Sequence, residues 1–200
     1  MKIGIISDTH DDLDNVRKAI EIFKENKVSL IVHAGDFIFP GVVDEFKKLK
    51  DELPTIEISG VLGNNDGEKL VLLKKFSEMS SELKIEFDDR IIGSLRFGIY
   101  HGTSKELTEA AIQSSIYDVF IHGHTHKRRN EIVQIVGKKS KRTHVLNPGT
   151  AHRSFPNIDR NIEEKSSVII YDIKDKSCQF IDLSTGSPLE EPLLISKYER

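Results

Sequence analysis

The first sixty residues alternate between short apolar runs and amphipathic segments, and this alternation constrains the fold more than any other feature. Apolar runs rich in β-branched residues and without a two-residue period occupy residues 2–6, 28–32 and 55–59. Such runs are typical of strands buried on both faces. Apolar residues recur at helical spacing over residues 13–23 and again over about 42–49. The order strand, helix, strand, helix, strand predicts parallel βαβ units with right-handed crossovers.

The rest of the chain is predicted to add two helices and a set of later strands, some of them in hairpins. The helices are expected at residues 68–79 and 108–115, and the strands at residues 84–87, 94–100, 117–121, 131–136, 143–146, 168–173 and 178–183. Asp88-Asp89-Arg90 is interpreted as a joint between two strands, and residues 137–142 as a basic hairpin tip. Residues 184–200 have no predicted place, so we expect one domain over residues 1–183 and a C-terminal tail.

Composition excludes several classes of protein. A chain of 200 residues with 38% hydrophobic and 30% charged residues suits one globular domain. A net charge of -3 provides no global basic field for nucleic acid. The single cysteine, Cys178, cannot form an intrachain disulfide. No apolar run approaches the ~20 residues of a membrane span, and charge appears too early for a signal peptide, so a cytoplasmic enzyme or adaptor is expected.

Five predicted strands each end in a turn with a side chain that can bind a metal ion. These side chains are Asp8 and His10, Asp36, Asn64, His101, and His124 with His126. Loops that follow parallel strands converge at one edge of a sheet, so we expect these groups to meet. Oxygen and imidazole donors without thiolate suit divalent Mn, Fe, Ni or Zn. Seven ligands are too many for one tetrahedral ion, but they suit two ions that share a bridging carboxylate, for which Asp36 is the best candidate.

Two metal ions in one site would indicate a specific chemistry. A pair about 3.5–4 Å apart stabilises both the attacking and the leaving oxygen of an in-line phosphoryl displacement and lowers the pKa of a bound water. The sequence therefore favours an enzyme that hydrolyses phosphate esters.

The five blocks resemble the ordered signature of the calcineurin-like metallophosphoesterases. They are Asp8-x-His10, Gly35-Asp36, Gly63-Asn64-x-Asp66, His101-Gly102 and Gly123-His124-x-His126. The resemblance covers about residues 1–150. The short chain, His33-Ala34-Gly35-Asp36 and the turn Asn147-Pro148-Gly149-Thr150 are similar to the small single-domain phosphodiesterases of bacteria and archaea. The resemblance implies an α/β fold, a four-layer α/β/β/α sandwich of two mixed sheets flanked by helices.

The resemblance also implies which residues hold each ion. One ion would be held by Asp8, His10, Asp36 and His126, and the other by Asp36, Asn64, His101 and His124. A hydroxide that bridges the two ions would attack phosphorus, with Asp36, Asn64 and His101 acting through the metals. Manganese is the expected metal, with nickel, zinc and iron as alternatives.

One position departs from the family pattern. Many members have a histidine after the asparagine of the third block, where it acts on the leaving group, but here that position is Asn65. Asparagine cannot act as a general acid at neutral pH. This departure favours a small phosphodiester as the substrate over a monoester, and it leaves open which group protonates the leaving oxygen. Asn65 and Arg153 are candidate substrate contacts.

Other interpretations remain open at this stage. A nuclease of the same fold, a non-catalytic interaction scaffold, and a phosphatase of nucleotides or sugar phosphates are alternatives, and a homodimer is compatible with the sequence. Asp66, His33 and His122 are expected to support the site, while His144 and His152 are expected to be structural or on the surface. The basic residues 127–129 and 138–142 are expected to be solvated, or to guide an anionic substrate.

Overall fold

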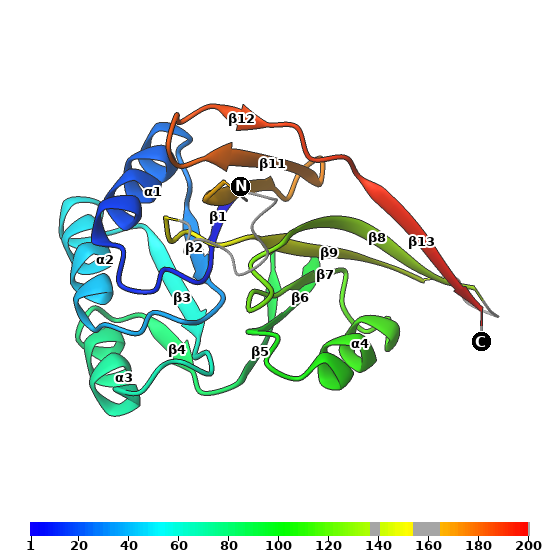
Figure 1. Cartoon of the computed structure of the whole chain (residues 1–200), viewed down its shortest axis with the longest axis horizontal. Coiled ribbons are helices and arrows are strands. Elements are labelled where there is room, and N and C mark those ends of the chain that lie inside the picture. The colour runs from blue at the N-terminus through cyan, green and yellow to red at the C-terminus, as the bar shows by residue number, and fades with distance from the viewer. Residues whose placement is uncertain (137–140, 154–164, 200) are drawn as a thin grey trace.

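The computed structural model describes residues 1–136, 141–153 and 165–199, so residues 137–140 of the expected basic hairpin tip lie outside the described part. Two β-sheets pack face to face, with three helices against the outer face of one and a single helix against the other (Figure 1). The predicted four-layer α/β/β/α sandwich is therefore confirmed.

The first sheet contains the predicted βαβ units. Its order is β12-β11-β10-β1-β2-β3-β4, in which β1 to β4 are parallel and β10 to β12 are antiparallel. The strands are β1 (Lys2–Ile6), β2 (Leu30–His33), β3 (Glu57–Val61), β4 (Glu82–Lys84), β10 (Ser167–Asp172), β11 (Ser177–Asp182) and β12 (Pro188–Leu189). The helices α1 (Leu13–Glu25), α2 (Gly41–Glu52) and α3 (Lys69–Glu78) cover its outer face.

The second sheet is mixed and has the order β13-β8-β9-β7-β6-β5. Its strands are β5 (Phe87–Ile92), β6 (Leu95–Tyr100), β7 (Val119–Ile121), β8 (Arg128–Val136), β9 (Lys141–Pro148) and β13 (Leu194–Glu199). Helix α4 (Lys105–Gln113) follows β6 and contributes to a small apolar cluster on the outer face of this sheet.

Strand β1 shows why the sequence of a central strand lacks a two-residue period. Ile3 and Ile5 point into the apolar core between the sheets, whereas Ile6 belongs to the core under the helices. Both faces are buried, so both need apolar side chains. Gly4 lies beneath helix α1, where a Cβ atom would come within 2.6 Å of the Phe23 ring. The absence of a side chain at Gly4 therefore lets helix α1 pack closely against the sheet.

Two predictions about the middle of the chain were wrong. The strand expected over residues 84–87 is instead the passage between sheets, because β4 ends at Lys84 and β5 begins at Phe87. The expected joint Asp88-Asp89-Arg90 lies inside β5. Asp88 is buried there and forms an ion pair with Arg90, which allows a charged run to occupy a strand.

The C-terminal residues that had no predicted place belong to both sheets. Strand β12 pairs with β11 at the edge of the first sheet. Strand β13 runs parallel to β8 at the edge of the second, with Leu194 opposite Glu131. The last strand follows β8 along an arm that extends away from the body of the molecule (Figure 1). Among the described residues, no helix has the length and apolar character needed to cross a membrane.

Candidate metal centre

The predicted ligands lie on loops from both sheets, and not from a single sheet as expected. The loops after β1, β2 and β3 carry the carboxylates and the asparagine, and the loops after β6 and β7 carry the later histidines. Five of the seven predicted ligands have left-handed backbone conformations: Asp8 (φ 53°), His10 (41°), Asp36 (59°), His124 (67°) and His126 (58°). Such conformations cost about 1–3 kcal/mol each in non-glycine residues and cluster at functional sites. The concentration of left-handed residues in these loops indicates a functional site without reference to residue type.

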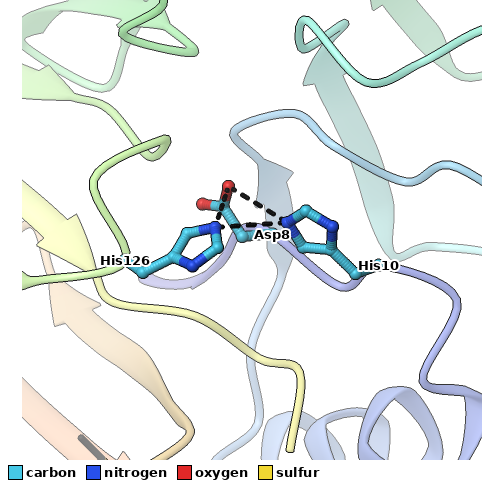
Figure 2. A group of neighbouring side chains, drawn as sticks. All are labelled: Asp8, His10 and His126. Atoms are coloured by element: carbon cyan, nitrogen blue, oxygen red, sulfur yellow. Dashed lines mark hydrogen bonds and ion pairs between the residues drawn. The ribbon is translucent and has the colours of Figure 1, made fainter. Parts of the chain in front are cut away.

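Asp8, His10 and His126 form the first group of converging ligand atoms (Figure 2). The Nε2 atoms of the two histidines are 3.2 Å apart. Asp8 Oδ1 lies 3.3 Å from Nε2 of His126 and 3.8 Å from Nε2 of His10. The three side chains come from two different loops and point toward a common centre.

A second group adjoins the first and shares Asp8 with it. It consists of Asp8, Asp36 and His101. Asp36 Oδ2 is 3.2 Å from Nε2 of His101 and 3.7 Å from Nε2 of His10. Asn64 Oδ1 lies 3.1 Å from the same His101 nitrogen, which brings its carbonyl oxygen into this group. Asp8 and Asp36 therefore both stand between the two groups, whereas Asp36 alone was predicted to be the bridge.

The surroundings of Asp8 provide a test of whether these residues fit a metal ion. Asp8 Oδ1 is buried and, within the described chain, accepts no hydrogen bond, although it faces the Nε2 atoms of His126, His10 and His101 at 3.3–4.0 Å. A buried carboxylate oxygen without a donor is costly. A divalent cation among these nitrogen and oxygen atoms would satisfy it, and the donor set suits such an ion. The residues present fit a metal site.

The other oxygen of Asp8 is held by neighbouring donors. Asp8 Oδ2 accepts hydrogen bonds from Ser7 Oγ at 2.6 Å and from the backbone nitrogen of His124 at 3.0 Å. A Cβ atom at Gly123 would lie 2.6 Å from this oxygen, so only glycine permits the approach. The left-handed residue of the turn after β7 is His124, and Gly123 has no positive φ. The glycine is needed for space and not for backbone conformation.

Asp36 is held by the loop that follows β3. Its Oδ1 accepts a hydrogen bond from the backbone nitrogen of Asn65 at 2.8 Å, and its Oδ2 accepts one from Asn65 Nδ2 at 2.7 Å. Asp66 binds the backbone nitrogens of Asp36, Gly63 and Ile38, which ties the loop after β2 to the loop after β3. Asp66 thus supports the site as expected. Asn65, a candidate substrate contact, directs its amide toward Asp36.

Charge at the centre follows from these contacts. Burial opposes ionisation of Asp8, but its interactions with His10 and His126 outweigh burial and hold its pKa well below the usual range. The pKa of Asp36 is lowered in the same way by His101. Burial opposes charge on His101 as well, yet the two carboxylates raise its pKa, and Asp8 raises that of His126. The two carboxylates and the neighbouring imidazoles therefore attract one another, and a divalent ion among them would compete with protons for the imidazole nitrogens.

The remaining histidines near the centre occupy different roles. His124 is outside both groups, and its ring lies 5.2 Å from that of His101. His33 is buried, with Nδ1 accepting a hydrogen bond from the backbone of Gly35 and Nε2 3.2 Å from Thr9 Oγ1. Burial lowers its pKa to about 3, so it stays neutral. His33 holds the turn before Asp36, in keeping with its expected supporting role.

His122 is also buried and lies in a contact network behind the metal-binding turn. Its Nδ1 is 3.2 Å from Nδ2 of Asn147. That amide donates as well to the carbonyl of Gly123 and to Thr125 Oγ1. Asn147 thus fixes the turn that carries His124 and His126, which gives the Asn147-Pro148-Gly149-Thr150 segment a structural purpose.

Arg153 lies beside the centre but is occupied by carboxylates. Its guanidinium contacts both oxygens of Asp12 at 2.9–3.0 Å and Asp14 at 2.8 Å. It lines a cavity of about 480 Å³ together with His152. Its charge is thus already paired, which weakens its candidacy as a phosphate contact.

His152 was expected to be structural or on the surface, but its ring lies 6.0 Å from that of His10. The segment is held there by Thr150 Oγ1 and the His152 nitrogen, which both donate to the carbonyl of Asp8. Its position follows from this pairing with the loop after β1. A residue 144 positions away in the sequence gives no local signal of such a contact.

Comparison with known proteins identifies a family. Residues 1–176 match the calcineurin-like phosphoesterase superfamily domain. A phosphodiesterase from Methanocaldococcus jannaschii is 42% identical over 155 residues, which cover 74% of this chain and 83% of that protein. A probable metallophosphoesterase from Methanothermobacter thermautotrophicus is 27% identical over 194 residues, which cover 94% of this chain and 95% of that protein.

Solved structures agree with the sequence comparisons. The structure of a novel archaeal phosphodiesterase superposes with a TM-score of 0.74 at 36% identity, covering 91% of this chain and 99% of that one. A phosphoesterase from E. coli superposes with a TM-score of 0.63 at 18% identity, covering 95% and 97% of the two chains, and shares the fold. With a site built from Asp and His side chains, these similarities show that the chain belongs to the calcineurin-like phosphoesterase superfamily and is a metal-dependent phosphoester hydrolase.

Proposed function

We propose that this chain is a phosphodiesterase with a dinuclear metal centre at the junction of its two sheets. The observation that carries the proposal is the position of Asp8 Oδ1, which is buried, accepts no hydrogen bond within the described chain and faces three imidazole nitrogens. Two adjoining groups of ligand atoms share this residue. The 42% identity to a protein named as a phosphodiesterase supports the substrate class.

The proposal assigns each residue a task. The ions would be held by Asp8, His10, Asp36, Asn64, His101, His124 and His126. When bound, two divalent ions supply Lewis-acid polarisation of the phosphoryl group and an activated water. Manganese is the ion we expect first. The protein's own contribution is to keep two carboxylates ionised and close together, with Asn65 fixing the rotamer of Asp36.

Small diesters are favoured over nucleic acid by the charges beside the centre. The cavity next to His10 is lined by Asp11, Asp12 and Asp14 as well as by Arg17 and Arg153. Both guanidinium groups are paired with carboxylates. Binding to a nucleic-acid backbone depends on cationic side chains that are available to several phosphates. This surface instead suits a substrate with one phosphate group and an uncharged or cationic remainder.

The test compares a diester and a monoester that share one leaving group, such as bis-p-nitrophenyl phosphate and p-nitrophenyl phosphate. Purified protein is freed of metal and loaded in turn with Mn, Ni, Zn and Mg. We expect a higher kcat/KM for the diester, because the guanidinium groups of Arg17 and Arg153 beside the centre are already paired with carboxylates and would not offset the second negative charge of the monoester. A consistent preference for the monoester would overturn the proposed substrate class, and activity without any divalent ion would overturn the mechanism.

A further inference from the structure

The outer edge of strand β13 is an exposed apolar surface that the catalytic centre does not use. Strand β13 pairs with β8 on one side and, within the described chain, with no strand on the other. Large exposed apolar side chains gather on this strand, directly before it and at the end of β8: Leu194, Ile195 and Tyr198, then Leu193, and Val136. An edge strand of this kind is a ready template for pairing with another strand. The outer edge of β13 is therefore a candidate site for pairing with a strand of another chain.

The opposite edge of the same sheet shows how this protein protects a strand edge. In β5, the carboxylate of Asp88 is buried and paired with Arg90. Arg90 also contacts Glu82 of β4 in the other sheet. An inward-pointing charge on an edge strand opposes pairing with a further strand. From Leu194 to Tyr198, β13 carries one charged residue, Lys197, which is exposed.

We propose that β13 pairs antiparallel with β13 of a second copy of this chain, about a two-fold axis through Ser196. In this register Leu194 lies opposite the partner's Tyr198, and Ile195 lies opposite the partner's Lys197. The first pair is aromatic and aliphatic, and such cross-strand pairs stabilise sheets. In the second, the aliphatic stem of lysine covers isoleucine while its ammonium stays in water. All five residues from Leu194 to Tyr198 find a partner.

The charge of Lys197 and the length of the strand favour this register over those with the axis one residue away. An axis through Lys197 would place that lysine against its own copy, and like charges directly opposite one another are destabilising. An axis through Ile195 would pair only the three residues 194–196 within the strand. Self-complementarity about one axis is the property required of a closed two-fold interface. It is the reason for assigning the edge to a second copy and not to an unrelated peptide.

The position of the strand leaves the metal centre accessible. Strand β13 runs beside β8 from Glu131 to Val136, moving away from the turn that carries His126. This part of the sheet forms the arm that extends from the body of the molecule (Figure 1). Pairing at the arm would join two six-stranded sheets into one continuous sheet, with both metal centres outside the interface.

The first test measures mass in solution by sedimentation equilibrium of the full chain. We expect twice the 22.7 kDa of one chain. Ile195→Lys would place a lysine opposite the partner's Lys197 at both symmetric positions and should raise the dissociation constant by more than about tenfold. Ile195→Glu should retain the dimer, because the new carboxylate meets that lysine. Ile91→Lys on the other edge, at a side chain that is 75% exposed, should change nothing.

A thiol cross-link tests the register itself, in a Cys178→Ala background. Directly opposite Cα atoms in antiparallel strands are about 4.5–5.5 Å apart, whereas diagonal ones are about 7–8 Å apart and beyond disulfide reach. Ser196→Cys should form a covalent dimer on mild oxidation, while Lys197→Cys should not. A monomeric wild-type chain, a dimer unaffected by Ile195→Lys, or equal cross-linking of both cysteine variants would overturn the proposal.

Discussion

The two halves of the metal centre differ in how firmly their side chains are held. The half from the first sheet contains Asp8 and Asp36, which are buried and fixed by hydrogen bonds from Ser7, Asn65 and the His124 backbone. The half from the second sheet contributes imidazoles, of which His101 is buried and held by the carbonyl of Ala34, whereas the side chain of His126 remains 39% exposed. The rigid half therefore carries the negative charge, and the second half includes one imidazole, that of His126, that solvent can reach.

This contrast predicts that the largest loss follows removal of a carboxylate from the rigid half. Asp36→Asn keeps the shape of the side chain but removes a charge that faces His101 of one ligand group and His10 of the other. We expect kcat/KM for the diester to fall by more than about a thousandfold, because metal-bound stabilisation of the transition state is worth several kcal/mol. Thermal unfolding of the metal-free variant serves as the control for folding. A loss of less than tenfold would contradict the role assigned to Asp36.

Removal of the His126 imidazole from the second half should cost less. For His126→Ala we expect a loss of roughly a hundredfold in kcat/KM, with partial recovery when free imidazole is added, because this side chain is partly exposed and its site can admit a small molecule. His152→Ala is the matched control. Its ring also lies near His10 but belongs to neither ligand group, so its effect should be less than about tenfold. Equal losses in the two variants would remove the distinction between them.

The four-layer fold was predicted from the sequence and is confirmed, and the candidate ligands could be named from the sequence, although their binding of metal stays a prediction. Each ligand follows a buried apolar strand directly, so local pattern and residue type are sufficient to identify Asp8 or His101 as a candidate. The sequence could not show that the loops come from two sheets, because pairing between distant strands leaves no local signature. Strand β13 is the clearest case, since Leu194 pairs with Glu131, 63 positions earlier. Asp88 was misjudged because a charged run is typical of a turn, and its burial beside Arg90 inside β5 became evident only in three dimensions.

Removal of the Asn65 side chain, which supports Asp36 in the rigid half, should reduce activity less than the two variants above. Asn65→Ala removes the Nδ2 contact to Asp36 but leaves the backbone contact in place. Loss of a group that orients a metal ligand typically costs 10–100-fold, and the retained backbone hydrogen bond argues for about tenfold here. Titration of the metal-free variant with Mn, followed by activity, measures this. An unchanged metal dependence would indicate that the amide acts elsewhere.

The stability contributed by His144, outside the centre, should depend on pH in the opposite sense to that contributed by His101 inside it. Burial lowers the pKa of His144 to about 4, whereas carboxylates raise the pKa of His101. Between pH 6.5 and about 4, His144 binds a proton in the unfolded chain but not in the folded chain. The free energy of unfolding therefore decreases as the pH falls through this range. His144→Gln keeps a donor for Asn130 and should reduce this decrease by roughly 2 kcal/mol in denaturant titrations. A steeper decrease in the variant would contradict this assignment.

The number of metal ions per chain tests the central claim most directly. Anomalous diffraction at the manganese edge, on crystals grown with Mn, would locate each ion, and elemental analysis of the same protein would count them. We predict two ions, one beside His10 and His126 and one beside His101, with Asp8 or Asp36 between them. A fully active enzyme that holds a single ion would contradict the account.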